Sequence, residues 1–493
     1  MASDFDVIAV LEDETATLRL AEDVGMILLP GDSVALSGDL GAGKTTFARA
    51  LLRALADDPA LEVPSPTFTL VQSYPGRISV AHFDLYRVRT AAELDELGFE
   101  EALAEGAALV EWPERAEGRL SPASMRIAFE VQGAGRRARI TASGTQAARL
   151  SRTFAIRAFL DSAGWRGAAR SYLQGDASTR RYERVRSGDN SAILMDWPSR
   201  QKDAPSDPRA AHRAQEVGAF AAVGMALRAL GLSAPKVKAM DRPAGFLLLE
   251  DLGSEGVLVG GEPDAQKYRI AIEVLATIHG RPRPEELPLL DGTTHRLPRY
   301  TADALAAELG IFLDWYFSRA VGKVADEPVR QAFAAAWSEP LRRLNDSEKS
   351  WVLLDVHSPN LLWLRERAGL ARIGLLDFQD MMIGPSAYDV ASLAQDARAT
   401  VSPDLERALK EHYIDLRSAD SGFDRESFEA VYAILAAQRA TKILGVFARL
   451  AAQGKSQYLR HIPRLREYLR RSLAHPALTG YAQWYRNHLP PEA

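Results

Sequence analysis

Gly38-Asp39-Leu40-Gly41-Ala42-Gly43-Lys44-Thr45-Thr46 decides the fold of the first part of this chain, and it directly follows the apolar run Val34–Leu36. Glycines let backbone N–H groups surround phosphate oxygens at a helix N-terminus, while Lys44 supplies a charge to the β- and γ-phosphates and the Thr45 hydroxyl is placed to bind Mg2+. The stretch therefore predicts a P-loop after a strand, with nucleotide contacts from Gly38, Gly41, Ala42, Gly43, Lys44, Thr45 and Thr46.

The bulk composition limits the classes of protein to consider. The chain has 493 residues, of which 47% are apolar and 25% are charged, with a net charge of -5 and no cysteine. At about 150 residues per domain we expect two or three globular domains. The small net charge gives no general attraction to nucleic acid, and disulfides and thiolate sites are excluded. Because neither a signal-peptide pattern nor an apolar run of about 18 residues is present, we expect a cytoplasmic protein outside the membrane.

Short β-prone runs alternate with helical stretches in the first part of the chain. This pattern is typical of a parallel sheet covered by helices and predicts an α/β P-loop NTPase domain over residues 1–147. The polar stretch 143–146 is the expected domain boundary, before a helical segment at 153–163. The predicted strands are 26–29, 33–37, 67–74, 78–83, 108–112, 126–131 and 137–142, and the predicted helices are 44–56 and 91–97.

Three further segments accompany the P-loop: Pro64–Leu70, His82–Arg87 and Leu109–Arg115. Together the four motifs resemble the small ATPase subunit of the bacterial machinery that makes threonylcarbamoyladenosine in tRNA. The resemblance implies slow ATP hydrolysis with Mg2+, partner proteins of the threonylcarbamoyl-transfer complex, and contact with tRNA through those partners. It also implies that the segment around Ser65–Phe68 is a mobile switch.

Asp84 and Glu111 each end an apolar β run, where a carboxylate can meet Mg2+ beside the P-loop threonine. A solvated strand end is the alternative for either residue. We expect Lys44, Glu111 and Asp84 to be catalytic groups, with Glu111 contacting the metal beside Thr45 or positioning water. Asp84 is expected to act behind the direct metal ligands or in nucleotide-dependent switching. His82 is assigned no catalytic role.

A second phosphoryl-transfer pattern begins at Asp355. In Trp351–Leu362 an Asp precedes Asn360 by five positions, and Asp377 follows the apolar run Ile373–Leu376. Phosphoryl transfer needs this spacing, because one carboxylate receives the proton of the acceptor hydroxyl while an Asn and a second Asp hold Mg2+. Asp355 is therefore the expected base, and Asn360 and Asp377 the expected metal ligands.

The segments 383–393 and 396–398 resemble the aminoglycoside-phosphotransferase-like kinases, and 175–182, 193–196 and 442–450 narrow the resemblance to the bacterial anomeric kinase of N-acetylmuramate and N-acetylglucosamine. This implies an α+β protein-kinase-like, two-lobed domain that uses ATP. We expect its N-lobe at 155–255 and its helical C-lobe at 256–493. Nucleotide contacts are expected from Ser178, Arg180 and the hinge residues Glu250 and Asp251.

Two departures from the kinase pattern stand out. Leu353 occupies the position two residues before Asp355 where the superfamily usually has His, so the brace of the catalytic loop must come from elsewhere or be absent. The strand 192–196 lacks the lysine that pairs with the α- and β-phosphates. Arg180, Arg181 or Lys202 could replace it, and Glu216 could organise that cation, although a solvated helix charge is the simpler reading of Glu216.

The sequence thus predicts a bifunctional enzyme: an ATPase serving tRNA modification joined to a kinase for the anomeric hydroxyl of an amino sugar in peptidoglycan recycling. Residues 439–471 hold nine Lys or Arg and one acidic residue, Glu467. Structural pairing plus substrate contact is the favoured explanation, and tRNA binding the minor one. Two alternatives remain open at this point: a kinase for another small alcohol or an aminoglycoside, and an inactive kinase-like scaffold or tRNA-binding module.

Overall fold

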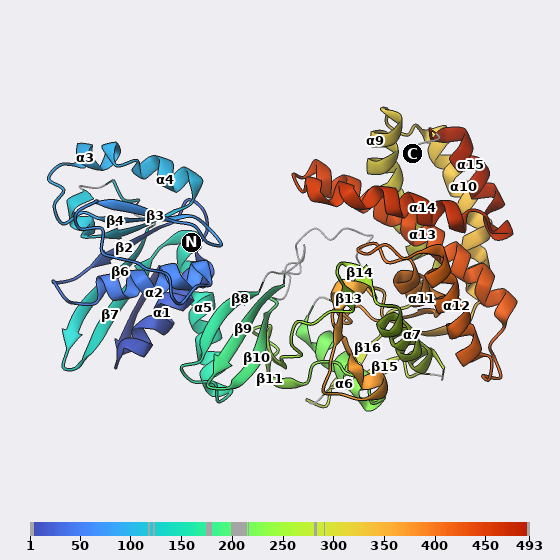
Figure 1. The fold of residues 1–493 in the computed structure, drawn as a ribbon, viewed down its shortest axis with the longest axis horizontal. Helices are drawn as coiled ribbons and strands as arrows, with labels where there is room; N and C mark the ends of the chain where they lie inside the picture. The colour runs from blue at the N-terminus through green and yellow to red at the C-terminus, as the bar shows by residue number, and fades with distance from the viewer. Residues whose placement is uncertain are drawn as a thin grey trace. The chain divides into compact units, whose positions relative to one another are not determined.

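The structure is a computed structural model that describes residues 4–116, 119–121, 124–173, 180–198, 214, 216–280, 283–289 and 291–490. The chain divides into two compact units, one of residues 1–198 and 238–251 and the other of residues 199–237 and 252–493 (Figure 1).

The first unit contains a seven-stranded sheet with the order β1-β7-β6-β2-β5-β4-β3. β2 runs parallel to β5 and β6, and β4 runs parallel to β5, whereas β1, β3 and β7 pair in antiparallel fashion. The P-loop joins β2 to α2, as predicted. The elements are β1 Phe5–Leu11, α1 Glu14–Ile27, β2 Ser33–Ser37, α2 Lys44–Ala56, β3 Val71–Tyr74, β4 Val80–Asp84, α3 Ala91–Glu96, α4 Phe99–Glu105, β5 Ala107–Glu111, β6 Met125–Gln132, β7 Gly135–Ala142 and α5 Gly144–Ser162.

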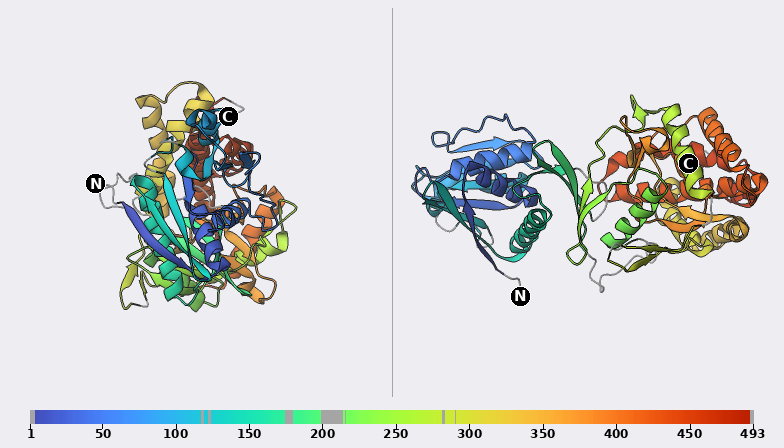
Figure 2. Two further views of the ribbon diagram at one scale, coloured as in Figure 1. Left: turned by 90° about the vertical axis from the view of Figure 1, so that its left-hand side faces the viewer. Right: turned by 90° about the horizontal axis from the view of Figure 1, so that it is seen from below.

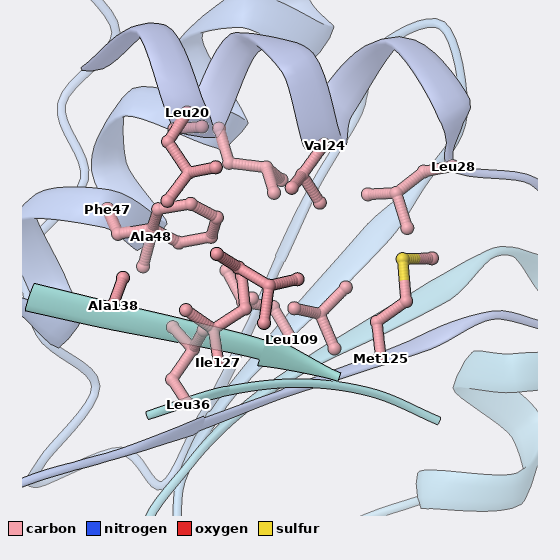
Figure 3. Close-up of a cluster of buried hydrophobic side chains, with 14 of the residues drawn as sticks. Leu20, Val24, Leu28, Leu36, Phe47, Ala48, Leu109, Met125, Ile127 and Ala138 are labelled. Atoms are coloured by element: carbon pink, nitrogen blue, oxygen red, sulfur yellow. The ribbon is translucent and has the colours of Figure 1, made fainter. Parts of the chain in front are cut away.

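The core of this sheet follows from the alternation of side chains along each strand. Leu36 and Leu109 face α1 and α2, where they pack against Val24 and Phe47 (Figure 3). The intervening side chains of β2, β4 and β5 face the other way and join a second cluster with α3 and α4. Helices therefore cover both faces of the parallel strands, which leaves their carboxyl ends to carry polar groups.

The predicted strand at 26–29 is wrong, because these residues form the end of α1 and the turn after it. Asp13 caps the helix by accepting a hydrogen bond from the Ala16 N–H at 2.8 Å. Leu20, Val24 and Ile27 recur at helical spacing and are buried. The apolar run at the end of the helix resembles a strand only when it is considered without the residues before it.

Helix α5 begins at Gly144, so the stretch 143–146 is a helix N-terminus and not a linker. The first half of α5 places Ala147 and Leu150 in the core of the P-loop sheet. Its second half places Phe159 and Leu160 against the next sheet (Figure 1). One helix is thus shared between two sheets, which is why the compact unit continues past the boundary predicted at 147. The functional division at 147, 155 and 255 stays a prediction.

The second sheet of this unit has the order β11-β12-β10-β9-β8. Its elements are β8 Ala169–Leu173, β9 Arg181–Ser187, β10 Asn190–Asp196, β11 Val237–Asp241 and β12 Phe246–Glu250. Val185, Leu194 and Leu248 face α5. Because residues two apart along a strand share a face, Arg181 lies on this α5-facing side with Val185.

The second unit is mainly helical (Figures 1 and 2). Among the described residues, one helix, α13, is long and apolar enough to cross a membrane, yet 78% of its most apolar stretch is buried inside the protein. The elements are α6 Val217–Ala229, β13 Leu258–Val259, β14 Glu262–Pro263, α7 Ala265–His279, β15 Glu286–Pro288, β16 Thr294–Arg296, α8 Ala302–Ile311, a π-helical turn Phe312–Phe317, α9 Ser318–Val321, α10 Glu327–Arg343, β17 Lys349–Val352, β18 Leu361–Trp363, β19 Ile373–Leu375, β20 Met382–Pro385, α11 Ala387–Ala394, α12 Pro403–Arg417, α13 Arg425–Ala452, α14 Ile462–Ser472 and α15 Thr479–His488.

Candidate active sites

The P-loop of the first unit has a backbone that only glycine adopts easily. Gly38, Gly41 and Gly43 have φ values of 132°, 77° and 114°. A Cβ atom at Gly38 would lie 2.4 Å from the carbonyl oxygen of Phe129. The loop therefore has the conformation that directs backbone N–H groups toward a phosphate at the start of α2.

Lys44 is held inside this loop. Its ammonium donates to the carbonyl oxygens of Gly38 at 2.7 Å and Asp39 at 2.9 Å, and it lies 3.8 Å from the centroid of the Trp112 ring. Burial lowers the pKa of Lys44, while the charge of Glu111 opposes this shift. The side chain is thus preorganised beside the loop that would receive the phosphates.

Glu111 lies at the centre of the hydrogen bonds next to the P-loop. The Thr45 hydroxyl donates to its Oε2 at 3.1 Å, and His82 Nε2 lies 3.0 Å from its Oε1. His82 is fully buried and Glu111 is 2% exposed. His82, to which the sequence assigned no role, therefore orients the carboxylate, because a ring nitrogen and a hydroxyl fix its two oxygens. The register of β4 against β5 brings these residues together.

Asp84 is opposite Glu111 in that register and contacts the predicted switch segment. Its Oδ2 accepts hydrogen bonds from Thr67 at 2.7 Å and Ser65 at 3.1 Å, and its Oδ1 accepts from the Tyr86 N–H at 3.1 Å. Among the described residues Asp84 is thus tied to the 65–67 segment and forms no hydrogen bond or ion pair with Thr45 or Lys44. This geometry fits the switching assignment better than direct metal binding.

Arg136 is a further basic residue at this site that the motif analysis did not single out. From β7 its Nε donates to the Ala42 carbonyl oxygen at 3.0 Å, and its guanidinium also contacts the Gly41 carbonyl. It thereby supports the middle of the P-loop from a strand far along the chain. Only the pairing of β7 with β6, next to β2, places it there.

The second unit brings the predicted catalytic and metal loops together. Asp355 and Asn360 lie between β17 and β18, and Asp377 follows β19. The Asn360 amide donates to the Asp355 carbonyl oxygen at 2.8 Å, and the Leu376 N–H donates to the Asn360 carbonyl oxygen at 2.9 Å. Since the amide nitrogen is committed, the side-chain oxygen of Asn360 is the atom left to bind a cation.

The brace that Leu353 cannot supply comes from Asp389 on α11. This fully buried carboxylate accepts the Leu353 N–H at 2.7 Å and the Leu354 N–H at 2.9 Å. His279 Nε2 lies 3.5 Å from it. Leu354 has a φ of 69°, a left-handed conformation that costs a branched side chain free energy. Asp389 therefore holds a strained backbone directly before Asp355.

Asp377 also has left-handed backbone, with a φ of 56°. Its Oδ1 accepts a hydrogen bond from the Gln379 amide at 3.0 Å. The Gln379 side chain is buried, and its Oε1 finds no hydrogen-bond partner within the described residues. Gln379 thus orients the carboxylate that is expected to bind metal, a role that the sequence analysis did not assign.

Both sites fit Mg2+ by the chemistry of their donors. Thr45 with Glu111, and Asn360 with Asp377, offer only oxygen ligands, which Mg2+ prefers. The described part of the chain holds no group of three His, Cys, Asp or Glu side chains placed to bind a metal. Such a group is not required, because Mg2+ that binds together with nucleotide phosphates takes one or two protein ligands.

Asp396 and His357 form the other side of the catalytic loop. Asp396 accepts the Ser358 N–H at 2.7 Å and the Tyr268 hydroxyl at 2.8 Å. Burial lowers the pKa of His357; Arg439 and Arg398 act in the same direction, and Asp396 and Asp355 oppose. Within the described residues His357 Nδ1 has no hydrogen-bond partner. A neutral imidazole with an unused nitrogen therefore lies two residues after the proposed base.

Of the four residues predicted to contact the nucleotide in the N-lobe, Arg180, Glu250 and Asp251 are described by the structure. Ser178 and Lys202 lie outside the described residues. The Arg180 guanidinium lies 5.1 Å from the centroid of the Trp197 ring. Asp251 accepts hydrogen bonds from Arg184 at 2.9 Å and Ser191 at 2.5 Å, so its side chain braces the sheet and the neighbouring Glu250 ends β12.

Two further N-lobe candidates are placed by their elements. Glu216 is at the N-cap of α6, without a capping hydrogen bond from its side chain. Arg181 lies on the side of the sheet that faces α5, away from Ile193 and Met195 on the opposite face. Of the three cations considered for the missing lysine, Arg181 is therefore placed on the α5-facing side.

The basic stretch 439–471 is largely engaged within the fold. Lys442 pairs with Glu308 at 2.7 Å, Arg470 with Glu467 at 2.7 Å, and Arg471 with Glu406 at 2.9 Å. Arg464 donates to Thr400 and to the Ala397 carbonyl. These pairings favour the structural explanation of the positive charge over an open nucleic-acid surface.

Comparison with known families gives two matches, one in each part of the chain. Residues 11–139 match the family described as threonylcarbamoyl adenosine biosynthesis protein TsaE. Residues 170–430 match the family described as phosphotransferase enzyme family. The first range contains the P-loop, Asp84 and Glu111, and the second contains Asp355, Asn360 and Asp377.

Individual relatives divide the chain in the same way. An N-acetylmuramate/N-acetylglucosamine kinase of Caulobacter vibrioides is 39% identical over 354 residues, covering 68% of this chain and 96% of the relative. The protein of the same name from Pseudomonas aeruginosa is 30% identical, covering 61% of this chain and 82% of the relative. A tRNA threonylcarbamoyladenosine biosynthesis protein TsaE of Rickettsia felis is 40% identical over 123 residues, covering 25% of this chain and 71% of the relative.

Proposed function

The chain belongs to the TsaE family over its N-terminal part and to the phosphotransferase enzyme family over its C-terminal part, and from this we propose that it is a bifunctional enzyme. The N-terminal part would hydrolyse ATP in the making of threonylcarbamoyladenosine in tRNA. The C-terminal part would phosphorylate the anomeric hydroxyl of N-acetylmuramate or N-acetylglucosamine during peptidoglycan recycling. The observation that carries the proposal is the presence of two separate phosphoryl-transfer constellations, one in each unit.

In the ATPase the chain's own groups bind and orient the nucleotide. The P-loop amides and Lys44 hold the β- and γ-phosphates, and Thr45 with Glu111 would hold Mg2+, which supplies charge neutralisation on the phosphates. His82 keeps the Glu111 carboxylate in place. Asp84 is linked to the 65–67 segment because it accepts hydrogen bonds from the hydroxyls of Ser65 and Thr67.

Partner proteins are expected to bind beside this site. Leu40 in the P-loop and Phe68 after the switch hydroxyls are each 86% exposed, and Tyr86 after Asp84 is 52% exposed. Large apolar side chains exposed next to a switching segment are a common feature of protein interfaces. This supports a nucleotide-dependent contact with the threonylcarbamoyl-transfer proteins, through which the tRNA would be reached.

In the kinase Asp355 accepts the proton of the sugar hydroxyl as that oxygen attacks the γ-phosphorus, and ADP leaves. Asn360 and Asp377 would hold Mg2+ against the phosphates. Asp389 fixes the backbone directly before Asp355, so that the Asp355 carboxylate does not have to be ordered at the moment of reaction. The backbone after β12 would read adenine.

The acceptor is proposed from the charges around the catalytic loop. Arg398 and Arg439 are close enough to His357 to influence its pKa, and the Arg439 side chain is buried. A carboxylate such as the lactyl group of N-acetylmuramate would complement this positive charge. An uncharged N-acetylglucosamine would use the same loop without that contact.

The test is product formation from Mg-ATP with the two amino sugars and a panel of other small alcohols, followed by mass spectrometry and phosphorus NMR. We expect a sugar 1-phosphate that disappears in Asp355→Asn while N-terminal ATP hydrolysis continues. Lys44→Ala should give the reverse pattern, so each variant is the control for the other. If another alcohol is phosphorylated and the amino sugars are not, that alcohol becomes the assigned acceptor of the kinase. If the protein binds ATP but phosphorylates none of the compounds, the C-terminal part is better explained as a scaffold or tRNA-binding module.

A further inference from the structure

A cavity of about 490 Å³ in the first unit belongs to neither catalytic site. It lies among the end of α1, helix α5 and strands β8 and β9. Its lining includes five arginines, namely Arg77, Arg149, Arg152, Arg170 and Arg181. A cavity of this volume is in the range that holds small organic ligands. The ability of the cavity to bind an anion depends on how many of these guanidiniums already pair with carboxylates of the protein.

Three of the five arginines are paired with carboxylates. Arg149 contacts both oxygens of Asp32 at 2.7 Å. Arg152 pairs with Asp196. Arg170, whose side chain is fully buried, contacts Asp23 at 2.6 Å and Glu183 at 2.7 Å. The charges of these three guanidiniums are therefore satisfied within the protein.

Arg77 and Arg181 differ from the other three. Among the described residues, the Arg77 Nη2 donates to the carbonyl oxygens of Gly25 at 2.7 Å and Leu28 at 3.1 Å. Arg181 is exposed on β9, at the side of the sheet that faces the cavity. Within the described ranges of the chain, neither guanidinium forms an ion pair with a carboxylate.

These two charges are close enough to repel each other. Burial is the main cause that lowers the pKa of Arg77, and the charge of Arg181 adds to that effect. Two neighbouring guanidiniums that form no ion pair with a carboxylate are stabilised by an anion that binds to both. A phosphate monoester matches this demand, because it carries close to two negative charges and presents three acceptor oxygens, whereas a carboxylate carries one charge.

The rest of the cavity wall suits an organic group attached to that phosphate. Met26, Ile27 and Leu29 contribute apolar surface at the end of α1, and Tyr172 contributes an aromatic ring. The Arg77 guanidinium lies 5.3 Å from the centroid of that ring. Charge and apolar surface therefore meet in one cavity, as in sites that bind a phosphorylated small molecule.

We propose that this cavity binds a phosphate monoester, with the phosphate between Arg77 and Arg181 and the organic group against Tyr172 and the end of α1. The ligand would contact α1 of the P-loop part and strands β8 and β9 of the second sheet simultaneously. The inference stands apart from the proposed function, because no residue of either catalytic constellation takes part in it.

The experiment is calorimetric titration of the full chain, with both nucleotide sites filled by saturating Mg-AMPPNP. Three probes are titrated separately: inorganic phosphate, AMP and N-acetylglucosamine 1-phosphate. We expect at least one monoester to bind more tightly than inorganic phosphate. Tighter binding of AMP would indicate that the natural ligand is a nucleotide, and tighter binding of N-acetylglucosamine 1-phosphate that it is a sugar phosphate. Arg181→Gln and Arg77→Gln should each weaken that binding about 10- to 100-fold, as expected for the loss of one charge-assisted contact.

Arg126→Gln is the matched control, because Arg126 is exposed on β6 of the same unit and does not line the cavity. It should leave the affinity unchanged. Arg77→Gln also removes hydrogen bonds at the end of α1, so the exposed Arg181→Gln is the decisive variant if Arg77→Gln unfolds. Monoester binding that Arg181→Gln leaves unaltered, or the absence of monoester binding at millimolar concentration, would overturn the proposal.

Discussion

Replacing Asp389 by Asn tests how the catalytic loop of the kinase is held. Asp389 is fully buried and accepts two backbone hydrogen bonds, from Leu353 at 2.7 Å and Leu354 at 2.9 Å. Asn keeps the shape of the side chain and one carbonyl oxygen. Its NH2 group, however, must face one of the two backbone N–H groups, which converts an attraction into a repulsion.

The size of the effect follows from these two bonds. A hydrogen bond to a charged group contributes about 1.5–3 kcal/mol, and an unsatisfied buried donor costs about as much. If one such bond is lost and the other is weakened, the ordered conformation of the catalytic loop is destabilised by roughly 3 kcal/mol. If the reaction requires that conformation, the rate changes by about 150-fold. Because Leu354 has a strained φ of 69°, the backbone before Asp355 is expected to relax when the brace is lost.

The assay measures sugar phosphorylation through the release of ADP. The values of kcat and KM for the acceptor are determined separately. We expect kcat to fall about 100-fold with little change in KM, because Asp389 touches the loop and not the substrate. Asp404→Asn is the control, since Asp404 is exposed on α12 and pairs with Arg407 at the surface. N-terminal ATP hydrolysis by the same variant reports whether the chain is intact.

A folded Asp389→Asn protein with a kcat within threefold of the original would refute the role of Asp389 as the brace. A parallel fall of ATP hydrolysis would attribute the loss to unfolding of the whole chain. Urea denaturation of both variants separates these cases. A local effect lowers kcat while the urea midpoint of unfolding stays near that of the control variant, whereas unfolding of the chain lowers the midpoint as well.

Further variants test the remaining features. Gly38→Ala should abolish nucleotide binding at the P-loop and lower stability by about 1–3 kcal/mol, since its Cβ would lie 2.4 Å from a carbonyl oxygen, while sugar phosphorylation persists; nucleotide titration and thermal melting measure this. Arg170→Met should destabilise the first unit by about 3–5 kcal/mol in urea denaturation, because the buried Glu183 loses its ion pair and Asp23 keeps only the one with Arg157. Burial lowers the pKa of His461 to about 4, and its arginine neighbours add to this effect. Below its unfolded pKa of about 6.5 the unfolded state binds more protons, so the original protein should lose stability from pH 6.5 toward pH 4, and His461→Gln should lose less in melting curves.

The resemblance of the two halves to their families, the predicted fold class and the identity as a P-loop and phosphotransferase enzyme are confirmed by the family matches. These predictions depended on contiguous motifs, whose chemistry resides in backbone conformation and in residues a few positions apart. The helix predicted at 44–56 agrees with α2 for the same reason. The individual site assignments stay predictions.

The structure does not divide at the polar stretch that was predicted as the boundary between the two parts. The polar residues at 143–146 look like a linker, yet they start a helix whose two halves pack against different sheets. Whether a polar segment is a loop or the first turn of a helix depends on what its apolar side meets. Arg170 illustrates the same limit, because its partner Asp23 comes from α1, far away in the chain.

The sequence by itself determined the chemical type of both candidate sites: a P-loop from Gly38 to Thr46, and a predicted base, Asp355, with two predicted metal-binding side chains, Asn360 and Asp377. Only the tertiary structure decided which residues hold those groups in place. His82 meets Glu111 through strand register, and Asp389 meets the loop before Asp355 through the packing of α11. Motifs specify local backbone and chemical type, whereas a buried carboxylate acquires its role from the partners that folding brings within hydrogen-bond distance.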